Sequence, residues 1–190
     1  MRQMEEKIVS CGKILAGDVL KVDNFLNHQI DVDFLAEAGR EFYRLYKDEG
    51  VTKVLTIEAS GIAIACLTAE CFHVPVLFAK KSTTSNMSKN VYASSVESYT
   101  HGCTYTVTVA KEYLNENDRV LIVDDFLAKG SALTALLDLV EQSGAVAVGC
   151  GIAIEKSYQE GGNSLRAKGV RVESLAKIAA MSEKDGIRFC

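Results

Sequence analysis

Two adjacent carboxylates, Asp124 and Asp125, are the side chains of this sequence best placed to do chemistry. They follow the apolar run 120–123, which is typical of a strand buried on both faces. A loop of small residues, 128–132, comes shortly after them and leads into a helical pattern. A helix N-terminus offers unpaired N–H groups to a phosphate, and α/β folds bind ligands at the carboxyl ends of strands. This order of elements predicts a binding site.

The acid pair limits the kind of ligand that such a site accepts. Carboxylates would repel a bare anion, so the ligand should also bring hydroxyl groups or a divalent metal ion to that end. A phosphorylated sugar meets both conditions. The residues alone leave three roles open for Asp124 and Asp125: binding sugar hydroxyls, acting as a metal or acid–base pair, or lying solvated in a loop. Neighbouring residues of a strand point to opposite faces, which disfavours a shared metal ion.

The stretch Val-Leu-Ile-Val-Asp-Asp-Phe-Leu-Ala-Lys-Gly-Ser-Ala, residues 120–132, resembles the signature of the type I phosphoribosyltransferases. In that family the acid pair holds the ribose hydroxyls of 5-phosphoribosyl 1-pyrophosphate (PRPP), and the loop holds its 5′-phosphate. The resemblance implies that Asp124 and Asp125 are the catalytic acid pair. It assigns five residues to PRPP: Ala128, Lys129, Gly130, Ser131 and Ala132. The family more often has Thr-Gly-Gly-Thr in this loop, but backbone amides do most of the phosphate binding, so we leave the Lys129 side chain unassigned.

Three further segments extend the resemblance to the xanthine-using enzymes of this family in bacteria: Val19–Gln29, Ile57–Gly61 and Ile154–Tyr158. On the residues alone, Asn27 is a turn residue and Lys156 is a surface cap at a strand end. The resemblance implies instead that Leu20, Asn27 and Lys156 bind xanthine. Lys156 would donate a charge-assisted hydrogen bond to the 6-oxo group of the base.

A second turn of small residues, Ala59, Ser60 and Gly61, follows the short apolar strand 53–57 and precedes the helical stretch 62–72. An ordinary turn between a strand and a helix is the plainer interpretation. The resemblance assigns this turn to the pyrophosphate of PRPP.

Lys80 and Lys81 open a polar stretch in which Met87 is the lone apolar residue between 82 and 90. Such a segment buries little surface, so we expect a flexible loop over about 80–103. A lid and a plain surface loop both fit this composition. The resemblance favours a lid that closes over the reaction centre, and it implies that both lysines bind PRPP, in their own subunit or in a neighbouring one.

Strand and helix patterns alternate along the chain, which predicts an α/β fold with a doubly wound, mainly parallel sheet flanked by helices. The resemblance identifies this as the type I phosphoribosyltransferase fold, with a small hood formed by about 1–30 and 157–190. A chain of 190 residues with 48% hydrophobic content suits one domain, residues 1–190. We expect Asp31 or Asp33 to cap the first long helix, and a looser piece to begin at Gly161.

Composition argues against several classes of partner. A net charge of −4 without any basic run disfavours nucleic acid. The six cysteines form no Cys-x-x-Cys pair, which favours free thiols in a reducing compartment. The charged N-terminus and the lack of a long apolar stretch argue against export and against a membrane partner. We therefore expect a cytoplasmic protein.

The resemblance implies a purine-salvage enzyme, a homodimer that transfers the 5-phosphoribosyl group from PRPP to N9 of xanthine, giving XMP and pyrophosphate. It also implies Mg²⁺ held mainly by PRPP, with no direct ligand from the protein. A guanine, hypoxanthine or adenine phosphoribosyltransferase is the closer alternative. A PRPP-sensing regulator of purine genes is the more distant one, because it should carry a DNA-binding domain or a basic face, and this sequence has neither.

Overall fold

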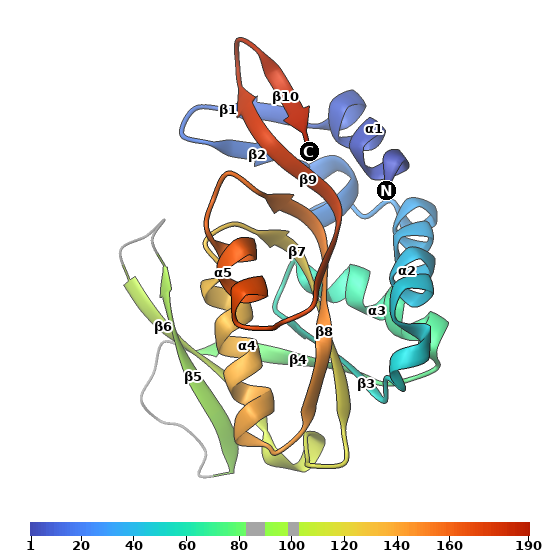
Figure 1. The fold of residues 1–190 in the computed structure, drawn as a ribbon, viewed down its shortest axis with the longest axis vertical. Coiled ribbons are helices and arrows are strands. Elements are labelled where there is room, and N and C mark those ends of the chain that lie inside the picture. The colour runs from blue at the N-terminus through green and yellow to red at the C-terminus, as the bar shows by residue number, and fades with distance from the viewer. Residues whose placement is uncertain (83–89, 99–102) are drawn as a thin grey trace.

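The computed structural model of the chain describes residues 1–82, 90–98 and 103–190, and within these it contains one eight-stranded sheet and a separate two-stranded one (Figure 1). The strands of the large sheet are, in chain order, β3 (Lys53–Ile57), β4 (Val76–Ser82), β5 (Val91–Ser98), β6 (Cys103–Ala110), β7 (Arg119–Leu127), β8 (Val146–Lys156), β9 (Val172–Ser182) and β10 (Gly186–Phe189). They lie in the order β10-β9-β8-β7-β3-β4-β6-β5. Neighbours from β9 to β4 are parallel, whereas β10, β6 and β5 are antiparallel to theirs. The mainly parallel sheet predicted from the sequence is confirmed.

Helices cover both faces of this sheet. The helices are α1 (Arg2–Cys11), α2 (Val32–Tyr46), α3 (Gly61–Phe72), α4 (Ser131–Gln142) and α5 (Gly161–Ala167). Leu121 and Val123 of β7 belong to the core that contains residues of α2 and α3, while Val120 and Ile122 belong to the core on the side of α4 and α5. Because both faces of β7 are buried, its sequence is apolar at every position from 120 to 123 rather than alternating.

The first long helix, α2, begins directly after a residue that caps its N-terminus. Asp31 is the residue before α2, and its Oδ1 accepts the N–H of Phe34 at 3.2 Å. After α2 a short 3₁₀ turn leads to Gly50, which has a left-handed φ of 63°. Of the two candidate caps, Asp31 is therefore the one that the chain uses.

The N-terminal segment packs against the C-terminal one at one end of the sheet. β1 (Lys13–Leu15) and β2 (Val19–Lys21) form an antiparallel hairpin, and α1 contacts β9. The N-terminal amine donates to the carbonyl of Leu175 in β9. In Figure 1 the hairpin, α1 and the β9–β10 hairpin lie together above the ends of β7 and β8.

Asn27, which the residues alone predict to be a turn residue, ends a π-helical turn over Asp23–Asn27. Phe25 and Leu26 are buried in this turn, and the Phe25 ring meets that of Phe34 edge to face, with centroids 5.7 Å apart. The sequence prediction missed this element because its apolar pair is too short to show a period.

Two segments of the chain depart from the predictions. Gly161 begins the helix α5 rather than a loose piece, and the strand β9 then extends from Val172 to Ser182. Within the predicted loop 80–103, the described residues include the end of β4, all of β5 and the first residue of β6. Residues 83–89 and 99–102 of this predicted loop lie outside the described part, so the predicted lid is not tested.

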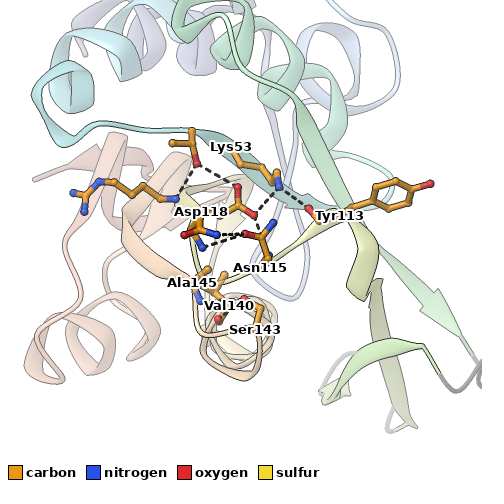
Figure 2. Close-up of polar contacts among 10 residues, drawn as sticks. Lys53, Tyr113, Asn115, Asp118, Val140, Ser143 and Ala145 are labelled. Carbon is orange, nitrogen blue, oxygen red and sulfur yellow. Dashed lines mark hydrogen bonds and ion pairs between the residues drawn. The ribbon is translucent and has the colours of Figure 1, made fainter.

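A polar cluster joins the amino ends of β3 and β7, at the end of the sheet away from the acid pair (Figure 2). Lys53 Nζ donates to Asp118 Oδ2 at 2.7 Å and to the carbonyl of Tyr113 at 2.5 Å. Thr52 and the N–H of Asn115 also donate to the Asp118 carboxylate. Burial pushes the pKa of Asp118 upward, but these hydrogen bonds outweigh it and hold the pKa below its ordinary value. The cluster stabilises the parallel pairing of β3 with β7.

Among the described residues, no helix combines the length and the apolar character that crossing a membrane requires.

Candidate active site

The acid pair lies inside β7 and is buried. Asp124 is 4% exposed and Asp125 is 8% exposed. Asp124 Oδ1 accepts the N–H of Asp125, and Asp125 Oδ1 accepts the N–H of Phe126, both at 3.0 Å. Burial raises the pKa of Asp124 well above its ordinary value, and the neighbouring charge of Asp125 raises it further, whereas the charge of Lys81 acts in the opposite direction. We expected the strand to end at the pair, but it continues to Leu127 in register with β8.

Asn27 is in direct contact with the acid pair, although the two are far apart in the sequence. Its Nδ2 donates to Asp125 Oδ2 at 3.3 Å. Its Oδ1 is buried and, within the described part of the chain, has no hydrogen-bond partner. A buried polar atom without a partner is costly, so this oxygen is ready to pair with a ligand.

The predicted phosphate loop and Lys156 line one cavity of about 450 Å³. All five loop residues, 128–132, contribute to its wall, together with Val19 and the hairpin turn before it. Gly130 has a left-handed φ of 85°, and α4 begins at the next residue. The cavity therefore lies at the N-terminus of α4, where backbone N–H groups favour an anion.

Lys156 ends β8 and is half-buried in this cavity. Its Nζ donates to the carbonyl of Asp18 in the turn between β1 and β2. Burial lowers the pKa of the Lys156 ammonium, and the negative charge of Asp18 partly opposes this. The lysine thus joins the carboxyl end of the sheet to the hairpin above it.

The predicted pyrophosphate turn, 59–61, lies against the acid pair. A Cβ atom added to Gly61 would overlap Thr56 Oγ1 and lie 2.9 Å from Asp124 Oδ1. The turn is also tied to β4, because Glu58 Oε1 accepts the N–H of Lys81 at 2.6 Å. The sheet therefore brings this turn and the acid pair together, as expected from the meeting of parallel strand ends.

Lys80 and Lys81 lie on opposite faces of β4. Lys81 Nζ is 5.6 Å from the ring centroid of Tyr105, a residue that lines the cavity of the phosphate loop. Lys80 instead lines a second cavity of about 650 Å³, together with Phe78 and Tyr113. Only Lys81 is on the side of the acid pair, whereas Lys80 faces away from it.

Leu20 is 6% exposed and belongs to the core beneath the β1–β2 hairpin. Its neighbour Val19, not Leu20, lines the cavity. A contact between Leu20 and xanthine stays a prediction.

Residues 21–176 match the model of a family described as the phosphoribosyl transferase domain. This chain belongs to that family. It is 51% identical to a xanthine phosphoribosyltransferase of Lachnoclostridium phytofermentans, over 98% of this chain and 96% of the relative. It is 49% identical to a xanthine phosphoribosyltransferase of Latilactobacillus sakei, over 96% of this chain and 94% of the relative.

Solved structures of the family share the architecture of this phosphoribosyltransferase. An adenine phosphoribosyltransferase of Giardia lamblia, in complex with 9-deazaadenine, has a TM-score of 0.77 at 21% identity, covering 92% of this chain and 97% of its own. One from Rhodothermus marinus has a TM-score of 0.75 at 23% identity, covering 93% of this chain and 99% of its own. At these identities the likeness shows the fold, and it confirms the predicted type I phosphoribosyltransferase architecture.

Several side chains of this phosphoribosyltransferase site were not singled out from the sequence. Tyr105, Phe126 and Gln159 line the cavity of the phosphate loop. Thr56 lies behind the turn of small residues, with its hydroxyl buried and unpartnered among the described residues. Two of these residues carried a local signal: Phe126 lies within the signature stretch 120–132, and Gln159 directly follows the segment Ile154–Tyr158.

The carboxylates of this phosphoribosyltransferase suit a metal ion that is held mainly by its substrate. Magnesium prefers a near-octahedral set of oxygen ligands and usually keeps several waters. Among the described residues, no three His, Cys, Asp or Glu side chains gather closely enough to form a metal cage. Asp124 Oδ1 and both carboxylate oxygens of Asp125 accept hydrogen bonds from backbone N–H groups or from Asn27. A magnesium ion at this site would therefore take most of its ligands from phosphate and ribose oxygens.

Proposed function

We propose that this protein transfers the 5-phosphoribosyl group of PRPP to N9 of xanthine, giving XMP and pyrophosphate. One observation carries the proposal: the 128–132 loop and Lys156 line the same cavity. One end of such a cavity suits a sugar phosphate and the other suits an oxo-purine. The full-length identity to relatives named xanthine phosphoribosyltransferases supports the choice of base.

On the ribose side, backbone N–H groups of 128–132 hold the 5′-phosphate, and Asp124 and Asp125 hold the 2′- and 3′-hydroxyls. The raised pKa of Asp124 shifts that residue toward its protonated form. In that form a carboxyl group can donate a hydrogen bond to a ribose hydroxyl as well as accept one. The ribose is thereby fixed for displacement at C1.

On the leaving-group side, the turn 59–61 and Lys81 hold the pyrophosphate. Negative charge develops on this group as its bond to C1 breaks, and the ammonium of Lys81 stabilises that charge. Magnesium, carried in by PRPP, supplies further neutralisation of the phosphate charge when it is bound.

On the base side, Lys156 donates to the 6-oxo group of xanthine and Asn27 binds near C2, under a hood formed by the N-terminal segment and β9–β10. Lys156 exchanges the carbonyl of Asp18 for the base when xanthine enters. Turnover measured with PRPP and each of xanthine, guanine, hypoxanthine and adenine tests the assignment. A higher kcat/KM for any of the other three bases than for xanthine would refute it.

Variants of Asn27 and Lys156 test the base site. Lys156→Ala is expected to lower kcat/KM for every 6-oxopurine by about tenfold or more, because a charge-assisted hydrogen bond is lost. Asn27→Ala is expected to narrow the ratio of kcat/KM between xanthine and guanine, because these bases differ at C2. Lys168→Ala, which removes an exposed lysine outside the cavity, is the matched control. If Lys156→Ala and Asn27→Ala both kept the wild-type kcat/KM values and the wild-type ratio between xanthine and guanine, the base would bind elsewhere.

We further propose that the protein is a homodimer whose interface includes the second cavity. Phe78 and Tyr113 are 37% and 55% exposed and line this cavity together, and grouped exposed apolar side chains mark interaction sites. Lys80 lines the same surface and faces away from its own acid pair. In a dimer built on this surface, Lys80 acts on the pyrophosphate in the partner's site.

Phe78→Asp is expected to convert the dimer to monomers, because it places a charge in an apolar interface. Light scattering coupled to gel filtration measures the mass. Val146→Asp alters another exposed apolar residue, 49% exposed and at the far end of β8, and should leave the mass unchanged. A Phe78→Asp variant with the wild-type mass would move the interface to another face.

A further inference from the structure

We propose that Arg166 is a positioning residue for PRPP. Its ion pair with the buried Glu155 fixes the start of α5 against the 128–132 loop and thereby sets the affinity of that loop for the 5′-phosphate. This inference rests on one part of the proposed function, namely that the 128–132 loop binds PRPP. It assigns no contact between Arg166 and the substrate.

The ion pair joins a buried carboxylate to a partly exposed guanidinium, because the Arg166 side chain is 29% exposed. Glu155 is 1% exposed, and its two carboxylate oxygens each accept one N–H group of Arg166 at 2.7 Å. The hydroxyl of Ser174 donates to the same carboxylate, and Arg166 also donates to the carbonyl of Val172 at 3.1 Å. Burial acts to raise the pKa of Glu155, but the hydrogen bonds from Arg166 and Ser174 outweigh it and keep the pKa below its ordinary value. Glu155 is therefore held as a carboxylate.

The pair reaches the phosphate loop through two glycines. A Cβ atom added to Gly162 would overlap Glu155 Oε1 and lie 2.8 Å from Arg166 Nη1, so the start of α5 rests directly on the pair. Gly161 donates its N–H to the carbonyl of Ala128 at 3.1 Å. A Cβ atom there would overlap that carbonyl oxygen. Close contacts thus connect the ion pair to Gly162, and Gly161 to the backbone of the loop.

The pair also lies beside the strand from which the loop departs. Glu155 of β8 is the register partner of Leu127, the last residue of β7. Figure 1 shows α5 next to the end of α4 that follows this loop. The loop is therefore held by its own strand on one side and by α5 on the other.

Stability alone does not account for such a pair. Replacing a buried ion pair with apolar residues of similar volume is often neutral or stabilising. The 128–132 loop, in contrast, binds phosphate through its backbone N–H groups. The directions of these N–H groups depend on the left-handed backbone conformation of Gly130. The affinity for an anion depends on where those N–H groups point. The contacts between α5 and the loop therefore help to set this affinity.

Binding of PRPP in the presence of Mg²⁺, measured by calorimetry, tests the proposal together with steady-state kinetics. In Arg166→Met, the Kd and KM for PRPP are expected to rise about tenfold while the KM for xanthine stays within about twofold. Arg166→Lys, which keeps the charge but loses the paired geometry, should fall between Arg166→Met and wild type. Because Arg166→Met leaves Glu155 buried and unpaired, the double variant Glu155→Gln/Arg166→Met keeps the test valid if the single variant does not fold.

Arg171→Met is the matched control. Arg171 also forms an ion pair, with Glu49 at 2.7 Å, but it supports the end of α2 and not the phosphate loop. The Arg171→Met variant should have a lower melting temperature than wild type and an unchanged Kd for PRPP. Wild-type PRPP affinity in the Arg166 variants, or equal weakening by Arg171→Met, would overturn the proposal. A wild-type protein that binds PRPP but does not use xanthine would refute the proposed function alone.

Discussion

Asp124→Asn and Asp125→Asn are each expected to lower kcat about 100-fold, because they change the groups that fix the ribose in the transition state. Folding should be affected much less. The pKa of Asp124 is raised in the folded protein, so its carboxylate destabilises the fold at pH values above the unfolded pKa. Asparagine does not ionise in either the folded or the unfolded state, so it removes this pH-dependent cost. The stability difference between Asp124→Asn and wild type should therefore favour the variant at neutral pH and shrink as the pH falls toward the unfolded pKa.

Initial rates with xanthine and PRPP measure the first effect. Thermal melts from about pH 4, near the unfolded pKa of an aspartate, up to about pH 8 measure the second. Melts with PRPP and Mg²⁺ separate loss of binding from loss of chemistry. Asp48→Asn, which changes an exposed aspartate after α2, is the control for a general effect of lost charge. Either variant of the pair retaining near wild-type turnover would remove that residue from the site.

The sequence predicts the site well where the signal is local. The apolar run 120–123 identifies a strand buried on both faces, and the acid pair and the small-residue loop follow it in order. The pair was nevertheless expected at the strand's end, because carboxylates are uncommon in strand interiors. The strand continues because Phe126 and Leu127 pair with β8, and the acids satisfy nearby backbone N–H groups.

Features that depend on distant partners were not predictable. Glu155 reads as a polar group at a strand end, yet it is nearly completely buried by its pair with Arg166. The helix α5 was missed because it is only 7 residues long and begins with two glycines, which are poor helix formers. Both glycines are required by close approach of other groups, and that information is tertiary.

The two lysines of β4 illustrate a related limit. Their adjacency in the sequence suggests a shared role, but alternation along a strand sends Lys80 and Lys81 to opposite faces. The sequence does not say which of the two faces the acid pair. That assignment depends on the orientation of the strand in the sheet.

Gly161→Ala is expected to lower kcat/KM for PRPP about 100-fold, since displacing a binding group by about 1 Å has effects of this size. The added methyl group would overlap the carbonyl oxygen of Ala128 and lie 2.6 Å from the N–H nitrogen of Gly130. Both are backbone atoms of the phosphate loop, which cannot rotate away as a side chain does. Either the loop or α5 must therefore move, and the KM for PRPP should rise more than the KM for xanthine.

Gly169→Ala separates this steric effect from the general cost of replacing a glycine. Gly169 follows α5, has a left-handed φ of 85°, and has no heavy atom within 4 Å of the added methyl group apart from its immediate chain neighbours. The substitution should cost about 1 kcal/mol of stability from backbone strain while leaving the KM for PRPP unchanged. If Gly161→Ala also keeps the wild-type KM, the contact between α5 and the loop adapts without moving the phosphate-binding N–H groups. In that case the loop is positioned by β7 and α4 alone.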